Sequence, residues 1–188
     1  MCRNQFLERY NPLCSVDAAL DQAINVSVLR NPTYTVGLNG TEKITFRNYW
    51  RERLIEIGRL FSIPKDRNFY LDNIQILKTE MNNRFYNSLQ PLRRNYDNGF
   101  RIAHSQKSIS IYLKHLWCMS LIPEPPCCPI DRRILIISGI NSRISWTRIN
   151  QLAEVQDILN QFTNVANQNN LSLSNWECQL FQNGQYTT

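Results

Sequence analysis

The chain carries one apolar stripe regular enough to fix much of its folding. Between Ser105 and Ile122 the large apolar side chains recur at intervals of three and four residues, at Ile109, Tyr112, Leu113, Leu116, Trp117 and Leu121. This spacing places them on one side of an α-helix. So much aromatic and aliphatic surface must be covered by other elements, and we therefore predict that residues 105–122 form the central core helix, with Trp117 buried.

The same period recurs along most of the chain. It predicts further helices over residues 15–30, 45–61, 66–86, 130–139, 145–162 and 174–181. Ser15, Thr45 and Asp66 are expected N-caps, because their short side chains can accept from the backbone of the first turn. Residues 33–45 contain β-branched residues and an Asn39-Gly40 pair, so their sequence is compatible with a small hairpin. We predict an all-α fold, a globular bundle of six or seven helices in one domain over residues 1–188.

A proline-rich corner follows the core helix. Residues 123–129 read PEPPCCP, and a residue before proline is pushed out of the helical region. The helix resumes near Ile130 and ends at Gly139, a natural residue to follow a helix C-terminus. Because the chain must double back over this corner, we expect Lys107 and Asp131 to face each other at the mouth of a groove.

Composition excludes a membrane-spanning segment and favours free thiols. The longest uninterrupted apolar runs, such as 134–137, are far too short to cross a bilayer. The first fourteen residues carry charges of both signs where a signal peptide would need an apolar segment. We therefore expect a cytoplasmic protein without membrane contact, whose six cysteines are free thiols.

Cysteine spacing does not match a common zinc motif. Cys127 and Cys128 are adjacent, so on an extended segment their side chains point in opposite directions. A zinc site would need Cys118, His104 or His115 as further ligands, and buried thiols are the alternative. We predict neither a metal nor a cofactor.

Positive charge is concentrated in the middle of the chain. Residues 43–148 hold 18 Lys and Arg against 8 acidic residues, a net charge of +10, whereas residues 149–188 hold three acidic residues and no basic one. Such asymmetry favours a polyanionic partner, and we predict a nucleic acid. The expected contacts are Arg47, Arg51, Arg93, Arg94, Arg101, Lys114, Arg132 and Arg133. The alternative is a solvated basic face that docks an acidic partner protein.

The run from Lys107 to Arg133 resembles the catalytic half of the helix-hairpin-helix DNA glycosylases. A helix opens with KSISIYLK, and a later Pro-Ile-Asp precedes the next helix. The resemblance implies that Lys107 attacks the anomeric carbon of deoxyribose while Asp131 assists loss of the base. It also favours DNA over RNA. The glycines of the family's hairpin are missing from the corresponding residues 98–106.

Other chemistries lack their usual markers. The chain has no glycine-rich phosphate loop, no His-Glu-x-x-His and no Gly-x-Ser-x-Gly. His115 and Cys118 share a helical face, so a further hypothesis is that Cys118 acts as a thiol nucleophile beside His115. Lys107 as a solvated residue and Asp131 as a charge at a helix N-terminus are the non-catalytic interpretations. We conclude that the chain is a nucleic-acid-binding protein, with glycosylase-like base processing as the sharper hypothesis and a non-enzymatic protein-interaction or structural module as the alternative.

Overall fold

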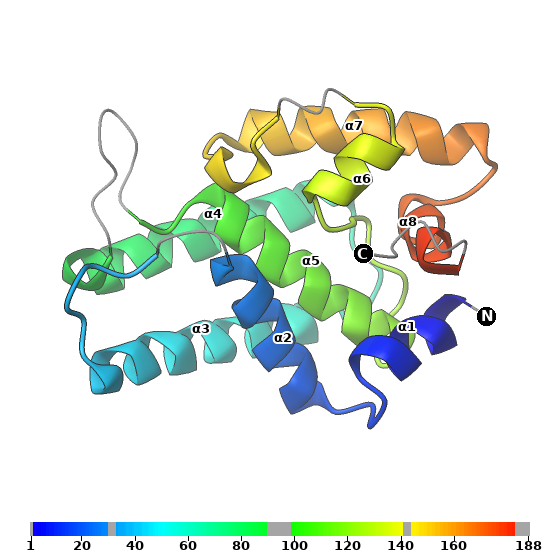
Figure 1. Ribbon diagram of the computed structural model, residues 1–188. Coiled ribbons are helices and arrows are strands. Elements are labelled where there is room, and N and C mark those ends of the chain that lie inside the picture. The colour runs from blue at the N-terminus through cyan, green and yellow to red at the C-terminus, as the bar shows by residue number, and fades with distance from the viewer. Residues whose placement is uncertain (1, 30–32, 90–98, 141–143, 183–188) are drawn as a thin grey trace.

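The computed structural model describes residues 2–29, 33–89, 99–140 and 144–182, and its regular secondary structure is helical. The described residues form α1 (Cys2–Tyr10), α2 (Val16–Val28), α3 (Gly40–Leu60), α4 (Arg67–Phe85), α5 (Ile102–Cys118), α6 (Arg132–Ile137), α7 (Leu152–Gln168) and α8 (Leu173–Gln182), with 3₁₀ turns η1 (Tyr86–Ser88) and η2 (Trp146–Arg148). The all-α prediction is confirmed (Figure 1). The helix beyond the predicted seven is α1. None of these helices is long and apolar enough to cross a membrane.

Two of the three predicted N-caps are confirmed and the third is wrong. The side chains of Ser15 and Asp66 accept from the first turns of α2 and α4. Helix α3 begins at Gly40 instead of after Thr45, because Asn39 and Glu42 close a reciprocal capping box. Because α3 begins this early, residues 40–45 are helical and the small hairpin considered for residues 33–45 does not form. The β pairing in the described parts of the chain is an isolated antiparallel bridge between residues 34 and 89.

Helix α5 lies at the centre of the bundle. It contacts α1, α2, α3 and α4, and Figure 1 shows it running between them. All of its residues except Ile111 are buried. Helix α3 crosses it closely at Gly58, where a Cβ atom would come within 2.9 Å of Leu116 and Tyr112. Trp117 is 6% exposed, which confirms its predicted burial.

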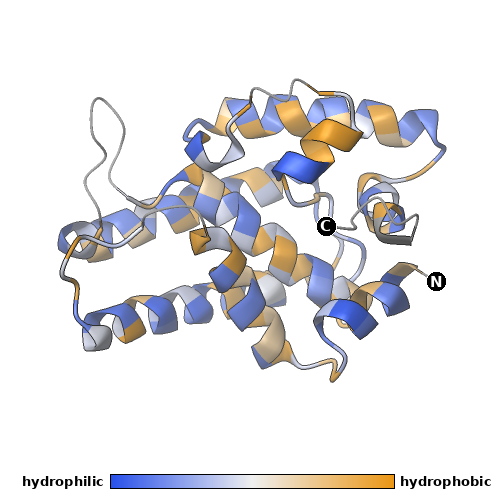
Figure 2. Cartoon of the chain, in the orientation of Figure 1, coloured by the Kyte–Doolittle hydropathy of each residue, from blue (hydrophilic) through white to orange (hydrophobic). Residues whose placement is uncertain are grey.

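Polar side chains are buried along α5 together with the apolar stripe. Figure 2 shows the mixed hydropathy of this helix. The indole of Trp50 donates to Ser108 over 3.2 Å, and the hydroxyls of Tyr70 and Ser110 lie 2.6 Å apart. Buried polar groups are tolerated when they are paired in this way. These pairs fix the rotation of α5 relative to α3 and α4, and therefore fix where its charged residues lie.

The proline corner is held from both sides. Gln106 on α5 donates from Nε2 to the carbonyl of Ile130 and accepts from its N–H, over 3.0 and 3.3 Å. The Ser174 hydroxyl on α8 lies 2.6 and 2.7 Å from the carbonyls of Pro125 and Cys127. The corner therefore returns the chain to the first turns of α5 in a defined position.

His104 makes the stability of the bundle sensitive to acid. Its Nδ1 accepts from the Arg101 N–H over 2.9 Å, so the neutral ring carries its proton on Nε2, which lies 3.1 Å from the Thr33 hydroxyl. Burial and, to a lesser extent, the charge of Arg101 together lower the pKa of His104 to about 3. Between the ordinary histidine pKa and this lowered value, the unfolded chain binds a proton at His104 and the folded chain does not. The free energy of unfolding therefore falls as the pH falls.

We expect the free energy of unfolding of His104→Gln to depend less steeply on pH than that of the parent protein. Between about pH 6 and pH 4 the free energy of unfolding should fall by about 1 kcal/mol per pH unit less in the variant than in the parent. Urea unfolding at a series of pH values measures both slopes. Parallel pH profiles for the two proteins would contradict the assignment.

A candidate active site in a basic groove

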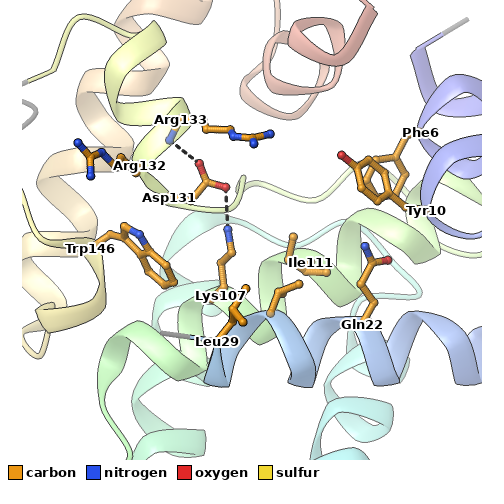
Figure 3. Close-up of a pocket in the computed structure, with 11 residues that line it drawn as sticks. Phe6, Tyr10, Gln22, Leu29, Lys107, Ile111, Asp131, Arg132, Arg133 and Trp146 are labelled. Atoms are coloured by element: carbon orange, nitrogen blue, oxygen red, sulfur yellow. Dashed lines mark hydrogen bonds and ion pairs between the residues drawn. The ribbon is translucent and has the colours of Figure 1, made fainter. Parts of the chain in front are cut away.

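A groove of about 340 Å³ runs between α2 and the start of α6 (Figure 3). Its floor is built by α5 and α2. Helix α5 supplies Lys107 and Ile111, α2 supplies Gln22 and Val26, and Leu29 follows directly as the C-cap of α2. These two helices pack directly against each other, so the floor belongs to the rigid part of the bundle.

Aromatic residues stand at the two ends of the groove. Phe6 and Tyr10 of α1 lie at one end, and Trp146 of η2 lies at the other, beside Lys107 (Figure 3). The Lys107 Nζ is 5.3 Å from the centroid of the Trp146 ring, within the range of a cation–π contact. The groove therefore offers flat apolar surfaces on both sides of a buried cation.

Lys107 and Asp131 meet inside this groove. The Nζ of Lys107 donates to Oδ2 of Asp131 over 2.8 Å, although 24 positions separate the two residues. The Lys107 side chain is 7% exposed and the Asp131 side chain 22% exposed. The prediction that the proline corner brings them face to face is confirmed, and the interpretation of Lys107 as a solvated residue is wrong.

Asp131 has a second, structural role as the N-cap of α6. Its Oδ1 accepts from the backbone N–H groups of Arg133 and Ile134, each over 3.0 Å. Burial alone would raise the pKa of Asp131, but the charge and hydrogen bond of Lys107, with the two backbone donors, outweigh burial and lower it. The group is therefore a carboxylate at neutral pH, with one oxygen turned toward the lysine.

Two of the predicted nucleic-acid contacts lie at the groove. Arg132 and Arg133 follow Asp131 in the first turn of α6, are exposed, and line the opening (Figure 3). Two guanidinium groups beside a half-open pocket suit a phosphate oxygen, which arginine binds with paired donors. The groove thus combines a buried amine, a carboxylate and exposed cations.

Arg47 and Arg51 lie elsewhere. They line a second hollow of about 300 Å³ between α2 and α3. Arg51 forms ion pairs with Asp17 and Asp21 of α2, at 2.8 Å for Asp17, and Arg47 donates to the Asn25 side chain. These two predicted contacts therefore lie apart from Arg132 and Arg133, and their side chains join α3 to α2.

Two more predicted contacts are buried. Lys114 is 3% exposed and pairs with Glu177 of α8, so it cannot reach a ligand on the surface. Arg101, at the start of α5, is also buried, and burial followed by the charge of Arg148 lowers the pKa of its guanidinium. Both side chains belong to the interior of the bundle. Arg93 and Arg94 lie outside the described residues.

The cysteines and histidines form no second reactive centre in the described ranges. All six cysteines are free thiols, and five of them are buried. The ring nitrogens of His115 have no hydrogen-bond partner there, and the ring packs against Phe6 at 4.7 Å, so a His115–Cys118 pair is not formed. No group of three His, Cys, Asp or Glu residues within these ranges is arranged to hold a metal ion.

Sequence reasoning missed the walls of the groove. Phe6 and Tyr10 lie on α1, which was not predicted, and Trp146 lies on a short 3₁₀ turn with no periodic pattern. Gln22 lies on a predicted helix, but nothing in the sequence marks it as facing a pocket.

Comparison of the chain with protein-family models, with curated proteins and with solved structures finds no match. Any functional conclusion therefore depends on the residues and geometry of the groove.

Proposed function

We propose that this protein binds nucleic acid at the groove and acts on a deoxyribose there, with Lys107 as an amine nucleophile and Asp131 as its carboxylate partner. The observation that carries the proposal is the 2.8 Å contact between these two groups inside a groove flanked by aromatic rings and arginines. An amine and a carboxylate in one partly dehydrated pocket are the groups that sugar chemistry of this kind needs.

Each group has a role that balances the reaction. The Lys107 nitrogen gives one proton to the departing base and forms a bond to the anomeric carbon while the bond from that carbon to the base breaks. The base leaves with the bonding electron pair and keeps that proton. The ring oxygen then takes a second proton from the nitrogen and leaves the anomeric carbon with its own bonding pair, which opens the sugar and leaves a protonated imine between Lys107 and the former anomeric carbon. Asp131 stabilises the positive charge that develops on the sugar during base loss.

The rest of the groove fits an unstacked nucleotide. An enzyme that reaches the sugar of a paired base must first take the nucleotide out of the stack, and aromatic side chains replace the lost stacking. Tyr10 and Trp146 supply such surfaces. Arg132 and Arg133 would neutralise the flanking phosphates, which are the sequence-independent part of the affinity.

Binding tests this proposal through its salt dependence. Each arginine that neutralises a phosphate contributes about 0.9 to the slope of log affinity against log salt concentration on duplex DNA. We therefore expect the double variant Arg132→Ala, Arg133→Ala to lower that slope by nearly 2. Fluorescence anisotropy with a duplex carrying one abasic site, at 50 to 200 mM salt, measures it.

The matched control removes the same charge away from the groove. Arg59 on α3 and Arg84 on α4 are exposed and do not line the groove. The double variant Arg59→Ala, Arg84→Ala should keep the parent slope. If the two double variants have equal slopes of log affinity against log salt concentration, the groove is not the nucleic-acid interface. No binding at 50 mM salt would remove the proposal and leave the alternative, in which the basic face docks an acidic protein.

A further inference from the structure

The groove is short and is bounded by aromatic rings. Phe6 and Tyr10 stand at one end and Trp146 at the other, and the volume between them is about 340 Å³ (Figure 3). Pockets of this order hold small molecules in proteins. The groove is therefore large enough to take a compound of a few carbon atoms next to the Lys107 amine.

The cations at the groove suit a ligand with a single anionic group. Arg132 and Arg133 are exposed and line the opening. Other predicted cations lie away from it, since Arg47 and Arg51 line a different hollow and Lys114 is 3% exposed inside the bundle. Two guanidinium groups can hold one phosphate with charge-assisted hydrogen bonds, whereas a long run of phosphates needs a longer row of cations.

The ion pair between Lys107 and Asp131 is preserved when the amine becomes an imine. A protonated imine carries its positive charge on the same nitrogen, so the carboxylate 2.8 Å away keeps a cationic partner. The ring of Trp146, whose centroid lies 5.3 Å from the Nζ, also favours a cation at this point. The surroundings of Lys107 are therefore as well matched to a protonated imine as to the ammonium group.

We propose that the groove binds a small aldehyde carrying one phosphate group, such as an open-chain sugar phosphate, as a protonated imine on Lys107. The phosphate lies on Arg132 and Arg133, and the aldehyde carbon meets the Lys107 nitrogen beside Asp131. This inference goes beyond the proposed function, because it needs the amine and the two arginines but no polynucleotide.

Formation of the imine needs no further reagent. Oδ2 of Asp131 takes one proton from the Lys107 ammonium group, and the amine adds to the aldehyde carbon while the C=O π pair moves to oxygen. A second proton passes from nitrogen to that oxygen and makes a hydroxyl group. Asp131 then returns its proton to the hydroxyl, which leaves as water with its bonding pair, and the nitrogen lone pair closes the protonated imine. Oδ1 of Asp131 stays on the backbone of α6 throughout.

Reductive trapping with two matched aldehydes tests the proposal. Glycolaldehyde phosphate and glycolaldehyde differ by the phosphate group, and cyanoborohydride fixes the imine that either one forms. Peptide mass spectrometry measures the rate of modification at each lysine. We expect Lys107 to react about 10-fold or more faster with glycolaldehyde phosphate, because charged hydrogen bonds hold the phosphate in place. The exposed Lys43 of α3 should react with both aldehydes at similar rates.

Three variants assign the adduct to the groove. Arg132→Ala, Arg133→Ala should lower the rate at Lys107 with glycolaldehyde phosphate to the rate with glycolaldehyde. Arg59→Ala, Arg84→Ala removes the same charge from exposed positions outside the groove and should keep the preference. Lys107→Arg keeps a cation beside Asp131 and cannot form an imine, so the phosphate-dependent adduct should be lost from a protein that remains folded.

The two proposals about this groove fail in different ways. If Lys107 reacts equally with the two aldehydes while an abasic oligonucleotide is still bound and trapped, the small-aldehyde inference is wrong and the proposed function stands. If Lys107 shows the phosphate-dependent adduct while the protein binds no oligonucleotide at low salt, the inference stands and the nucleic-acid proposal is wrong.

Discussion

Lys107→Ala should abolish the covalent adduct that borohydride traps between this protein and an oligonucleotide carrying an abasic site. The aldehyde of the opened sugar condenses with an amine, and borohydride reduces the imine to a stable bond. Lys107 is the lysine that lines the groove, and its Nζ lies beside a carboxylate that can stabilise a cationic sugar. Denaturing gel electrophoresis of the trapped mixture measures the yield.

Two further variants separate chemistry from nonspecific trapping. Lys43→Ala removes an exposed lysine of α3 and should leave the yield at the parent level. Asp131→Asn keeps an effective N-cap for α6 but removes the negative charge. It should therefore raise the activation free energy of base loss by more than it lowers the free energy of unfolding. If Lys107→Ala gives the adduct in undiminished yield, another amine forms it, and the enzymatic proposal is wrong.

Glu177→Ala should destabilise the protein by about 3 to 5 kcal/mol, because it leaves a buried ammonium without its partner. The Lys114 Nζ lies 2.5 Å from the Glu177 Oε2, and the two side chains are 4% and 2% exposed. Burial raises the pKa of Glu177, and the charge of Lys114 only partly opposes this. Lys114 also lies 4.4 Å from the Phe6 ring, so the pair joins α5, α8 and α1.

Replacing both partners should cost far less than removing one. The double variant Lys114→Met, Glu177→Leu keeps similar volume without a buried charge, and such exchanges are often neutral or stabilising. Urea unfolding followed by circular dichroism measures all three proteins. A loss below about 1 kcal/mol in Glu177→Ala would mean that water reaches Lys114, against the burial described here.

The helices and their local ends were readable from the sequence. Ser15 and Asp66 cap α2 and α4 as predicted, and Gly139 follows α6 with φ +70°, where a side chain would be strained. These features depend on neighbours within one turn, so spacing alone is enough to find them. The meeting of Lys107 and Asp131 was also predictable, because prolines restrict the corner between them to few paths.

Tertiary contacts decided the roles of the polar residues. Ser174 and Glu177 have the spacing of a capping box, but α8 begins at Leu173, Ser174 holds the proline corner, and Glu177 pairs with Lys114. The sequence placed Lys114 on a basic surface because its partner is 63 positions away. A periodic pattern records which face of a helix is apolar and carries no information about which distant charge meets it. The sequence by itself therefore determined the helices and the corner, and only their packing determined which cations face the groove.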